Sequence, residues 1–340
     1  MQAVYIRKHG GPEVLEVREL PDPVPSHGQV RVKVHAAGLN FAEVTARQGL
    51  YPDAPKPPCV VGYEGAGVVD AVGSGVDSPA VGTRVLFLSH FGGHASSVCV
   101  PTGYVFPMPE SMSFEHAAAL PVVYLTAYHV LFAIARLRRG EHVLVHMAAG
   151  GVGTAVLQLC RTVPDIVTYG TASASKHDYL RAQGCNHPID YRSEDYAVEV
   201  RRLTNGRGVD FVLDPLGGRD WRKGYDLLKP CGMLIAYGFA NTTTVGRRNL
   251  LRVLNEAMRA PWFNPISLMG DNRGVAGVNM GHLLGEQEML SAEISAIIDL
   301  YRQGKIEPHV HKTFPFSRAA DAHGELEHGR NIGKVLLTPD

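Results

Sequence analysis

The sequence predicts an α/β protein with two domains, a barrel-like β domain and a second domain built on a doubly wound parallel sheet. Residues 1–110 contain short strand-like runs separated by glycine and proline turns, a pattern typical of a β barrel. Residues 141–240 alternate strand-like and helical segments, which implies parallel strands joined by helices. With 340 residues, the chain is long enough to bury two hydrophobic cores.

The composition narrows the class of protein. The 33 lysines and arginines equal the 33 aspartates and glutamates, so a general nucleic-acid-binding protein is not expected. No apolar run reaches the ~18 residues of a membrane-spanning helix, and the charged N-terminus is unlike a signal peptide. The five cysteines are scattered and odd in number, which argues against a disulfide framework. We therefore expect a soluble protein of the reducing cytoplasm.

The β domain is predicted from both ends of the chain. Its strand-like runs lie at 3–6, 30–34, 67–72, 84–87 and 95–100. Residues 113–137 should be helical, with Pro121 dividing them into two helices because proline lacks the backbone N–H. The apolar run 335–337 predicts a C-terminal strand that could rejoin the first domain. We therefore expect the β domain at 1–122 and 265–340, with the α/β domain inserted at 123–264.

A glycine-rich turn begins the α/β domain, whose strands are predicted at 142–147, 166–170, 187–190, 210–214 and 233–237. The turn Ala148-Ala149-Gly150-Gly151-Val152-Gly153 follows the first strand and precedes a helical pattern. Gly150 and Gly153 match the last two glycines of the G-x-G-x-x-G dinucleotide fingerprint, and Ala148 takes the place of the first. A glycine at 150 lets a pyrophosphate approach the N–H groups of the helix N-terminus. The sequence therefore predicts a dinucleotide site at Ala149–Gly153.

The end of the second strand of this domain indicates which dinucleotide is bound. Sites for NAD carry Asp or Glu there, about 20 residues past the fingerprint. This chain has Ser173 and Lys176 instead, a hydroxyl and a cation that suit the 2′-phosphate of NADPH. The alternative is a solvated loop in which Ser173 caps the next helix.

Several motifs resemble the zinc-independent medium-chain dehydrogenase/reductases, in the quinone reductase and zeta-crystallin group. They are Ala37-Gly38-Leu39-Asn40-Phe41, Gly49-Leu50-Tyr51-Pro52, the glycine turn with its strand, and Asn331-Ile332-Gly333-Lys334. Within that group the chain is similar to the vesicle amine transport protein homologues. The segments that carry this similarity are Tyr169–His177, His187–Tyr191, Asp214–Gly218 and Lys223–Tyr225.

The resemblance covers nearly the whole chain and implies a GroES-like β-barrel domain, a Rossmann domain, NADPH and a homodimer. It places Asn40 beside the nicotinamide, Tyr51 at the mouth of the cleft and Tyr191 near the 2′-phosphate. It also implies cofactor contacts from Thr126, Gly238, Phe239, Val278, Asn279 and Asn331.

No metal is expected. Zinc-dependent relatives carry ligands where this chain has Asn40 and Tyr63, and Cys99 stands alone where they have a four-cysteine lobe. His309 and His311 lack a nearby third ligand, and a catalytic zinc needs at least three from the protein. A half-exposed strand explains this histidine pair more simply.

Without zinc, hydrogen-bond donors must polarise a substrate carbonyl, and Asn40 and Tyr51 are the catalytic candidates. Each candidate also has a purely structural explanation. Asn40 could be a turn amide bonded to the backbone, and Tyr51 a packed loop aromatic. Thr126 could bond back to its own helical turn, and Asn331 could simply form a turn before Gly333.

Two functions follow from these patterns. The first is an NADPH-dependent oxidoreductase that passes hydride to a small-molecule quinone or α,β-unsaturated carbonyl. The second is a nucleotide-binding interaction protein at membrane surfaces with little turnover. The basic, amphipathic stretch 247–263, with Trp262 and Phe263, favours the second because it could contact an anionic membrane. A solvated helix with one packed face is the commoner explanation of such a stretch.

Overall fold

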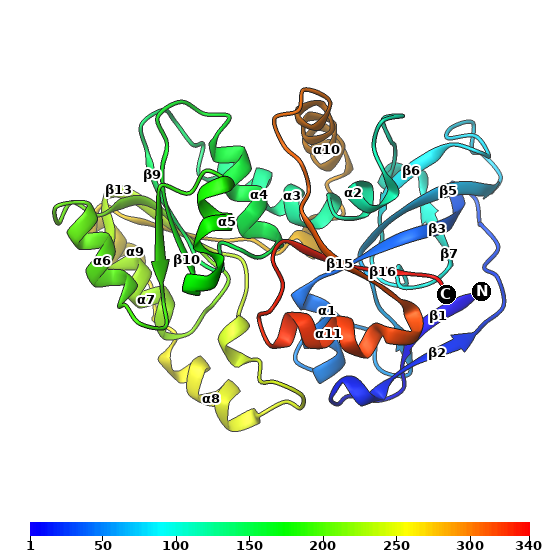
Figure 1. Cartoon of the computed structure of the whole chain (residues 1–340), viewed down its shortest axis with the longest axis horizontal. Coiled ribbons are helices and arrows are strands. Elements are labelled where there is room, and N and C mark those ends of the chain that lie inside the picture. Colours follow the sequence, from blue (N-terminus) through cyan, green and yellow to red (C-terminus); the bar gives the residue numbers. More distant parts are fainter. The chain divides into compact units, whose positions relative to one another are not determined.

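The computed structural model describes residues 1–340, which divide into two compact units (Figure 1). Unit 1 comprises 1–125, 244–248 and 281–340, and unit 2 comprises 126–243 and 249–280. In Figure 1, unit 1 is mostly blue, cyan, orange and red, and unit 2 is mostly green and yellow. The mixed α/β fold predicted from the sequence is therefore present.

Unit 1 is organised around a seven-stranded sheet in the order β15-β16-β3-β5-β6-β8, with β7 paired to β3. A three-stranded sheet, β2-β1-β4, accompanies it. The strands are β1 (Gln2–Ile6), β2 (Leu15–Glu19), β3 (Gln29–Leu39), β4 (Cys59–Val60), β5 (Glu64–Val72), β6 (Arg84–Leu88), β7 (Ser97–Pro101), β8 (Val105–Pro107), β15 (Val310–Pro315) and β16 (Lys334–Thr338). Helices α1 (Phe41–Gln48), α2 (Phe114–Ala118), α10 (Gln287–Arg302) and α11 (Ala319–Glu327) complete the unit.

The C-terminal strand returns to the first domain as predicted. β16 pairs antiparallel with β3, with Val335 opposite Leu39 and Leu337 opposite Ala37. The division of the helical region at Pro121 is also confirmed, because α3 (Pro121–Tyr128) begins at that proline. A π-helical stretch, His129–Ile134, continues α3.

The core of unit 1 follows the alternation of its strands. Every second residue of β3 from Val30 to Val34 is buried, and these valines pack with Val69, Val85 and Phe87. A second cluster lies between α11 and the strands β15 and β16, and includes Phe314 and Leu337. Burying one face of each strand in this way favours a single register, since a slip by one residue would expose the apolar set.

Unit 2 contains a six-stranded sheet in the order β11-β10-β9-β12-β13-β14, and each pair is parallel. Its strands are β9 (His142–Val145), β10 (Val167–Ala172), β11 (His187–Asp190), β12 (Val209–Asp214), β13 (Leu228–Ala236) and β14 (Gly274–Gly277). Its helices are α4 (Gly151–Cys160), α5 (His177–Ala182), α6 (Tyr196–Leu203), α7 (Arg219–Tyr225), α8 (Leu250–Arg259) and α9 (Pro265–Asp271).

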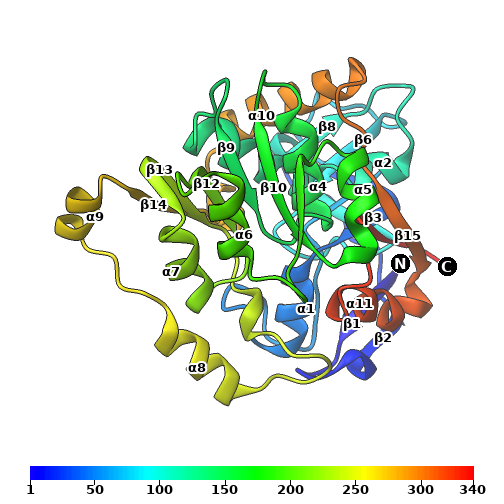
Figure 2. The same ribbon diagram turned by 60° about the vertical axis from the view of Figure 1, so that its left-hand side comes forward.

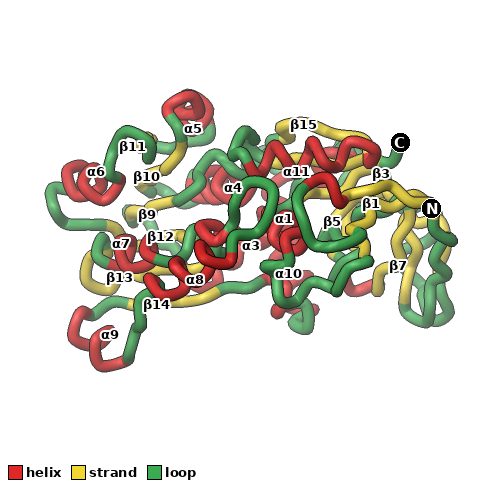
Figure 3. The backbone as a smooth tube through the Cα atoms, turned by 90° about the horizontal axis from the view of Figure 1, so that it is seen from below, coloured by secondary structure: helices red, strands yellow, loops and turns green.

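Helices lie on both sides of this sheet (Figure 3), and β9 lies between β10 and β12 (Figure 2). β10 and β11 are added on one side of β9, and β12, β13 and β14 are then added on the opposite side of β9. This doubly wound order confirms the Rossmann-type prediction, and ligands of such sheets bind beyond the carboxyl ends of the strands.

One segment differs from the predicted domain boundary. β14 pairs in parallel with β13, with Met233 opposite Gly274 and Ala236 opposite Gly277, so residues 265–280 lie in unit 2 and not in the β domain. The short stretch Gly274–Gly277 contains two glycines, which disfavour a strand intrinsically. Pairing with a neighbour formed more than 35 residues earlier decides its conformation, and no local pattern reveals it.

None of the helices combines the length and the apolar character that crossing a membrane requires.

The glycine turn gives a test of how closely α4 packs on its strand. A Cβ built at Gly153 would lie 2.5 Å from the Cα and carbonyl oxygen of Ala148, whereas one built at Gly150 meets only the Met147 carbonyl, at 3.2 Å. We expect Gly153→Ala to lower the free energy of unfolding by about 1–3 kcal/mol, because rigid backbone must shift. Gly150→Ala should stay within about 1 kcal/mol of the unaltered protein. Urea unfolding checks both, and equal losses would contradict the packing.

Candidate functional site

The glycine turn of unit 2 leaves a helix N-terminus without a protein cap. β9 ends at Val145, Gly150 is the N-cap residue, and α4 begins at Gly151. No side chain caps this end, so the first N–H groups of α4, from Gly151 to Gly153, have no side-chain acceptor. A Cβ at Gly150 would meet a single neighbouring atom, the Met147 carbonyl oxygen at 3.2 Å. Unused amide donors beside this glycine fit a pyrophosphate.

The next two strands bring the proposed 2′-phosphate residues together. Ala172 of β10 lies opposite Asp190 of β11, so Ser173 and Tyr191 leave neighbouring strand ends. Lys176 follows in the short turn Ala174–Lys176. Burial, and secondarily the positive charge of Arg192, lowers the pKa of the Lys176 ammonium.

Arg192 was missed in the sequence. It follows Tyr191 directly, and its guanidinium carbon lies 5.9 Å from the centre of the Tyr191 ring. A second cation next to Lys176 strengthens the positive potential at this strand end. Asp190 is nearby, but its carboxylate accepts bonds from the Arg192 N–H (3.1 Å) and the Ser193 hydroxyl (2.9 Å) within its own loop. The sequence signal that could have revealed Arg192 is a basic residue soon after the predicted strand 187–190.

Four further predicted cofactor residues lie at the carboxyl ends of β13 and β14. Gly238 and Phe239 follow β13, and the Val278 N–H donates to the Ala236 carbonyl at 2.9 Å, which extends the pairing of β13 and β14. The Phe239 ring stacks on Trp221, with 5.3 Å between ring centres, so its side chain packs within the unit. Asn279 is exposed, whereas Thr126 is buried within α3.

Unit 1 holds the candidate catalytic residue Asn40 in a buried polar cluster. The cluster consists of Asn40, Glu43, Glu64 and Lys334. Asn40 follows β3, Glu64 begins β5 and Lys334 begins β16, so the pairing of β3 with both other strands brings them together. The Lys334 ammonium donates to Asn40 Oδ1 and to Glu64 Oε1. Asn40 Nδ2 donates to the same Glu64 oxygen at 2.9 Å.

Lys334 determines the orientation of the Asn40 amide. An ammonium group can only donate, so the side-chain oxygen of Asn40 must face Lys334 and its NH₂ group must face the carboxylates. The second oxygen of Glu64 accepts the backbone N–H of Val122 at 2.6 Å, at the start of α3. Asn40 is therefore more than a turn amide, because strands and helices distant in sequence hold its side chain.

Glu43 is the most perturbed acid of this cluster. Its carboxylate accepts the Asn40 backbone N–H at 2.8 Å, as in a capping box at the start of α1. The side chain is fully buried, and burial raises the pKa of Glu43 to about 7, against the opposing effect of the Lys334 ammonium. With a pKa of about 7, Glu43 is protonated in only part of the population at neutral pH, and it lies next to Asn40.

Tyr51, Tyr63 and Asn331 also lie in unit 1. The rings of Tyr51 and Tyr63 meet edge to face, 6.2 Å apart, and Tyr51 packs on the apolar cluster that includes Ile6 and Val61. Burial raises the pKa of Tyr63 above its usual range, so its phenol stays neutral. Asn331 Nδ2 donates to the Gly333 carbonyl at 2.9 Å, which agrees with the turn expected there.

The structure contains no group of three or more His, Cys, Asp or Glu side chains that could share a metal ion. His311 bonds Glu325 at 3.1 Å and Val310–Pro315 forms β15, so the histidine pair of this segment has an ordinary structural role.

Comparisons with known proteins identify the family. Residues 26–110 match the profile described as "Alcohol dehydrogenase GroES-like domain", and residues 183–337 match "Zinc-binding dehydrogenase". The "Synaptic vesicle membrane protein VAT-1 homolog" of Rattus norvegicus is 47% identical over 346 residues, covering 100% of this chain and 84% of that protein. The chain belongs to the medium-chain dehydrogenase/reductase family. It falls in the quinone reductase-like group of that family.

Two further proteins that are similar to this chain have the names of enzymes. The "2-haloacrylate reductase" of a Burkholderia species is 31% identical over 345 residues, covering 100% of this chain and 99% of that protein. The quinone oxidoreductase of Escherichia coli, solved in complex with NADPH, aligns with a TM-score of 0.89 and 29% identity over all of both chains. The predicted fold is confirmed by this likeness.

Removing the cation of the buried cluster should destabilise the protein strongly. In Lys334→Met, the carboxylate of Glu64 stays buried without its ammonium partner, and we expect a loss of about 3–5 kcal/mol in the free energy of unfolding. The double variant Lys334→Met/Glu64→Gln should recover part of that loss, because no unpaired charge remains at position 64. Urea unfolding at pH 7 measures both. A loss below 1 kcal/mol in the single variant would contradict the described pairing.

The raised pKa of Glu43 predicts a pH dependence of stability. Because the folded pKa of about 7 lies above the ordinary value of 4.5, the folded state binds the proton more tightly and stability falls as pH rises between those values. Glu43→Gln removes this titration. It should equal the unaltered protein near pH 4.5 and exceed it by roughly 3 kcal/mol above pH 7. Unfolding curves from pH 4.5 to 8 check this, and parallel pH profiles would rule it out.

Proposed function

We propose that the protein is an NADPH-dependent oxidoreductase that passes hydride to a quinone or an α,β-unsaturated carbonyl without a metal ion. The observation that carries this proposal is the glycine turn, where the N-terminus of α4 has no side-chain cap. The neighbouring strand ends carry Lys176 and Arg192, where an NAD-binding site would have an Asp or Glu for the ribose. NADPH bound to a relative with the same fold supports the choice of cofactor. All five cysteines are free thiols, which suits the cytoplasm as the place of action.

The residues of unit 2 would bind and orient the dinucleotide. The N–H groups from Gly151 to Gly153 would donate to the pyrophosphate, aided by the dipole of α4. Ser173, Lys176 and Arg192 would bind the 2′-phosphate and reject NADH, which lacks it. When bound, NADPH supplies the hydride, and the protein supplies binding, orientation and electrostatics.

The residues of unit 1 would act on the substrate. In the absence of a Lewis acid, the Asn40 amide, held in one orientation by Lys334, would give up its longer bond, from Nδ2 to Glu43 Oε1 at 3.4 Å, and donate instead to the carbonyl oxygen on which negative charge develops. Glu43, which is protonated in only part of the population near neutral pH, would help to hold Asn40 by accepting its backbone N–H. Tyr51 remains a second candidate donor.

An NADPH-oxidation screen tests the proposal. Purified protein should oxidise NADPH in the presence of some member of a panel of quinones and enones, with far less than one zinc per chain by elemental analysis. Gly150→Ala should abolish NADPH binding with little change in apo-protein melting, since the methyl group occupies the phosphate space. Unchanged NADPH affinity in this variant would overturn the assignment of the turn.

Cofactor selectivity depends on the strand-end cations. Each charge-assisted bond to phosphate is worth about 1.5–3 kcal/mol, so Lys176→Ala should weaken NADPH by roughly tenfold or more and leave NADH affinity unchanged. Arg181→Ala is the matched control, because Arg181 lies on the following helix and pairs with Asp178 at 3.0 Å. Titration of each variant with NADPH and with NADH measures the two affinities. Equal affinity of the unaltered protein for NADH and NADPH would be the contrary result.

A second candidate function is contact with a membrane surface, and an exposed apolar face favours it. α8 presents Leu250, Leu251, Leu254 and Met258 to solvent, and Trp262, Ile266 and Met269 follow in and before α9. The exposed fractions reach 79% for Leu251 and 98% for Trp262. The same stretch carries Arg248, Arg252 and Arg259, although Arg252 Nε donates to the Asn241 carbonyl at 2.6 Å, and cations combined with an exposed apolar face are typical of helices that lie on anionic bilayers. Figure 2 shows α8 and α9 at the margin of the unit.

We expect Leu251→Ser/Trp262→Ser to reduce flotation with vesicles containing phosphatidylserine by more than tenfold, because each buried large apolar side chain contributes about 1.5–3 kcal/mol. Val198→Ser is the control, since Val198 is similarly exposed on α6. Flotation that is equally strong in the variant would contradict the membrane contact. Loss of the expected homodimer in the variant, measured by light scattering, would instead assign the face to a second copy.

A further inference from the structure

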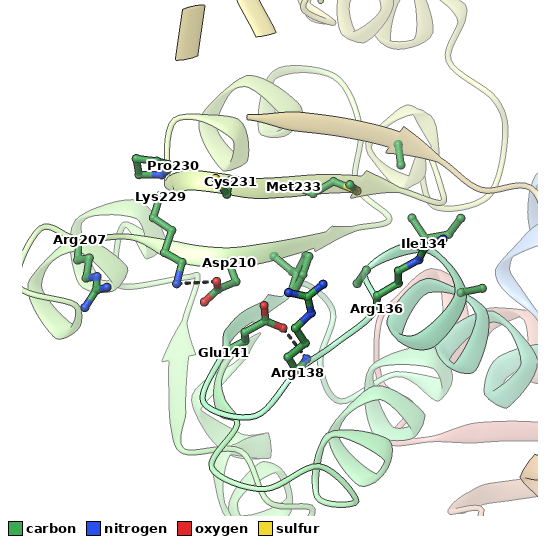
Figure 4. Close-up of a pocket in the computed structure, with 14 residues that line it drawn as sticks. Ile134, Arg136, Arg138, Glu141, Arg207, Asp210, Lys229, Pro230, Cys231 and Met233 are labelled. Atoms are coloured by element: carbon green, nitrogen blue, oxygen red, sulfur yellow. Dashed lines mark hydrogen bonds and ion pairs between the residues drawn. The ribbon is translucent and has the colours of Figure 1, made fainter. Parts of the chain in front are cut away.

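A second pocket lies in unit 2, at the edge of the sheet where the strands begin (Figure 4). Its volume is about 850 Å³, within the range of small-molecule sites. The walls come from the end of the π-helical stretch, the loop between it and β9, the start of β12, the stretch 229–233 of β13 and Ala276 of β14. The glycine turn follows the other end of β9, so the four-residue strand, about 13 Å long, separates the two places.

The charges around this pocket are unequal. Four cations line it, Arg136, Arg138, Arg207 and Lys229, against two carboxylates, Glu141 and Asp210. Both carboxylates are already engaged. Asp210 pairs with Lys229 at 2.6 Å and accepts the His142 N–H at 2.8 Å, and Glu141 accepts the backbone N–H of Arg138 at 2.6 Å.

The pocket therefore has two more positive than negative charges, because a bond from a backbone N–H leaves the Glu141 carboxylate charged. Arg136, Arg138 and Arg207 are exposed, and none of their side chains forms an ion pair in the structure. The neighbouring Arg139, which does not line the pocket, pairs with Asp165 at 2.6 Å. Unpaired guanidinium groups around one concave site favour a ligand with more than one negative charge, because each can donate two parallel bonds to a planar or tetrahedral anion.

The backbone of the pocket is strained on two walls. Arg136 and Cys231 have left-handed φ values of 52° and 67°, although neither is glycine or asparagine. The Cys231 N–H donates to the Asn272 carbonyl at 2.6 Å, which holds one of these conformations. Strained residues of this kind persist where surrounding structure enforces them, and they cluster at binding sites.

The remaining lining is apolar. Ile134, Phe211, Met233 and Ala276 are among the apolar residues that line the pocket. A simple inorganic ion would leave this surface uncovered, whereas a ligand with an aromatic or aliphatic body would bury it.

We propose that this pocket binds an organic phosphate with an apolar group, at a site separate from the glycine turn. The phosphate dianion would lie among Arg136, Arg138 and Arg207, and the apolar group would lie against Phe211 and Met233. This site is independent of the proposed oxidoreductase activity, because it uses other residues and the opposite edge of the sheet.

Calorimetric titration of the full chain with phenyl phosphate, in the presence of saturating NADP⁺, tests the proposal. Phenyl phosphate should bind more tightly than inorganic phosphate or benzoate, and more weakly as salt is raised. Arg207→Gln and Arg136→Gln should each weaken it by roughly tenfold, and Arg139→Gln should not. Arg207 lies on an exposed turn, so its variant should fold even if Arg136→Gln does not. Equal affinity in Arg207→Gln, or loss of binding on adding NADP⁺, would overturn the site.

Cys231 offers a readout that does not depend on activity. Its thiol is exposed and lines the pocket, whereas Cys160 and Cys185 are buried. The ratio of the alkylation rates with anionic iodoacetate and neutral iodoacetamide, followed at Cys231 by peptide mass mapping, should exceed the ratio for Cys59. It should fall in Arg207→Gln, and phenyl phosphate should protect Cys231 from both reagents. A ratio unchanged by Arg207→Gln, or no protection, would refute the proposal.

Discussion

The buried ammonium group of Lys334 is the interaction on which unit 1 depends. It joins Asn40 at the end of β3 to Glu64 at the start of β5, over sequence separations of 294 and 270 residues. Glu64 also accepts the backbone N–H of Val122 in the first turn of α3, so one carboxylate links three strands and a helix. Charges this deeply buried are costly unless all their partners are in place, and the cluster therefore requires the complete sheet before its energy becomes favourable.

Unit 2 depends on a different constraint, the close packing of small residues where β9 meets α4. Gly153 lies against the backbone of Ala148 and admits no side chain. Gly150, three residues earlier, has only the Met147 carbonyl oxygen near its Cβ position and is the N-cap of a helix without a side-chain cap. Two glycines of one motif therefore serve separate purposes. One brings the helix close to the sheet, and the other leaves the amide donors of that helix accessible to an anion.

Although the net charge of the chain is zero, its positive and negative side chains are unevenly distributed over the structure. Three arginines lie in the stretch 248–259 that contains α8, and three more line the pocket at the starting edge of the sheet, where four cations face two carboxylates. Total charge excluded a general nucleic-acid-binding protein, but local charge decides which smaller anions and surfaces can bind. An oxidoreductase activity and contacts with anionic partners are therefore compatible in one chain.

The sequence by itself determined the features that depend on neighbouring residues. The strand at 187–190, the helix start at Pro121, the glycine turn and the acid-free end of β10 are all local patterns, and each was predicted. Glu43, three residues after Asn40, is a local capping-box partner, but only the tertiary structure decided the partners Glu64 and Lys334, because these charged residues would by default be assigned to the surface. The same holds for β14, whose glycines form a strand only beside β13, and for Arg192, whose importance comes from Lys176 on the neighbouring strand end. Local patterns report propensity, whereas burial, pairing and charge compensation arise only once distant segments are packed together.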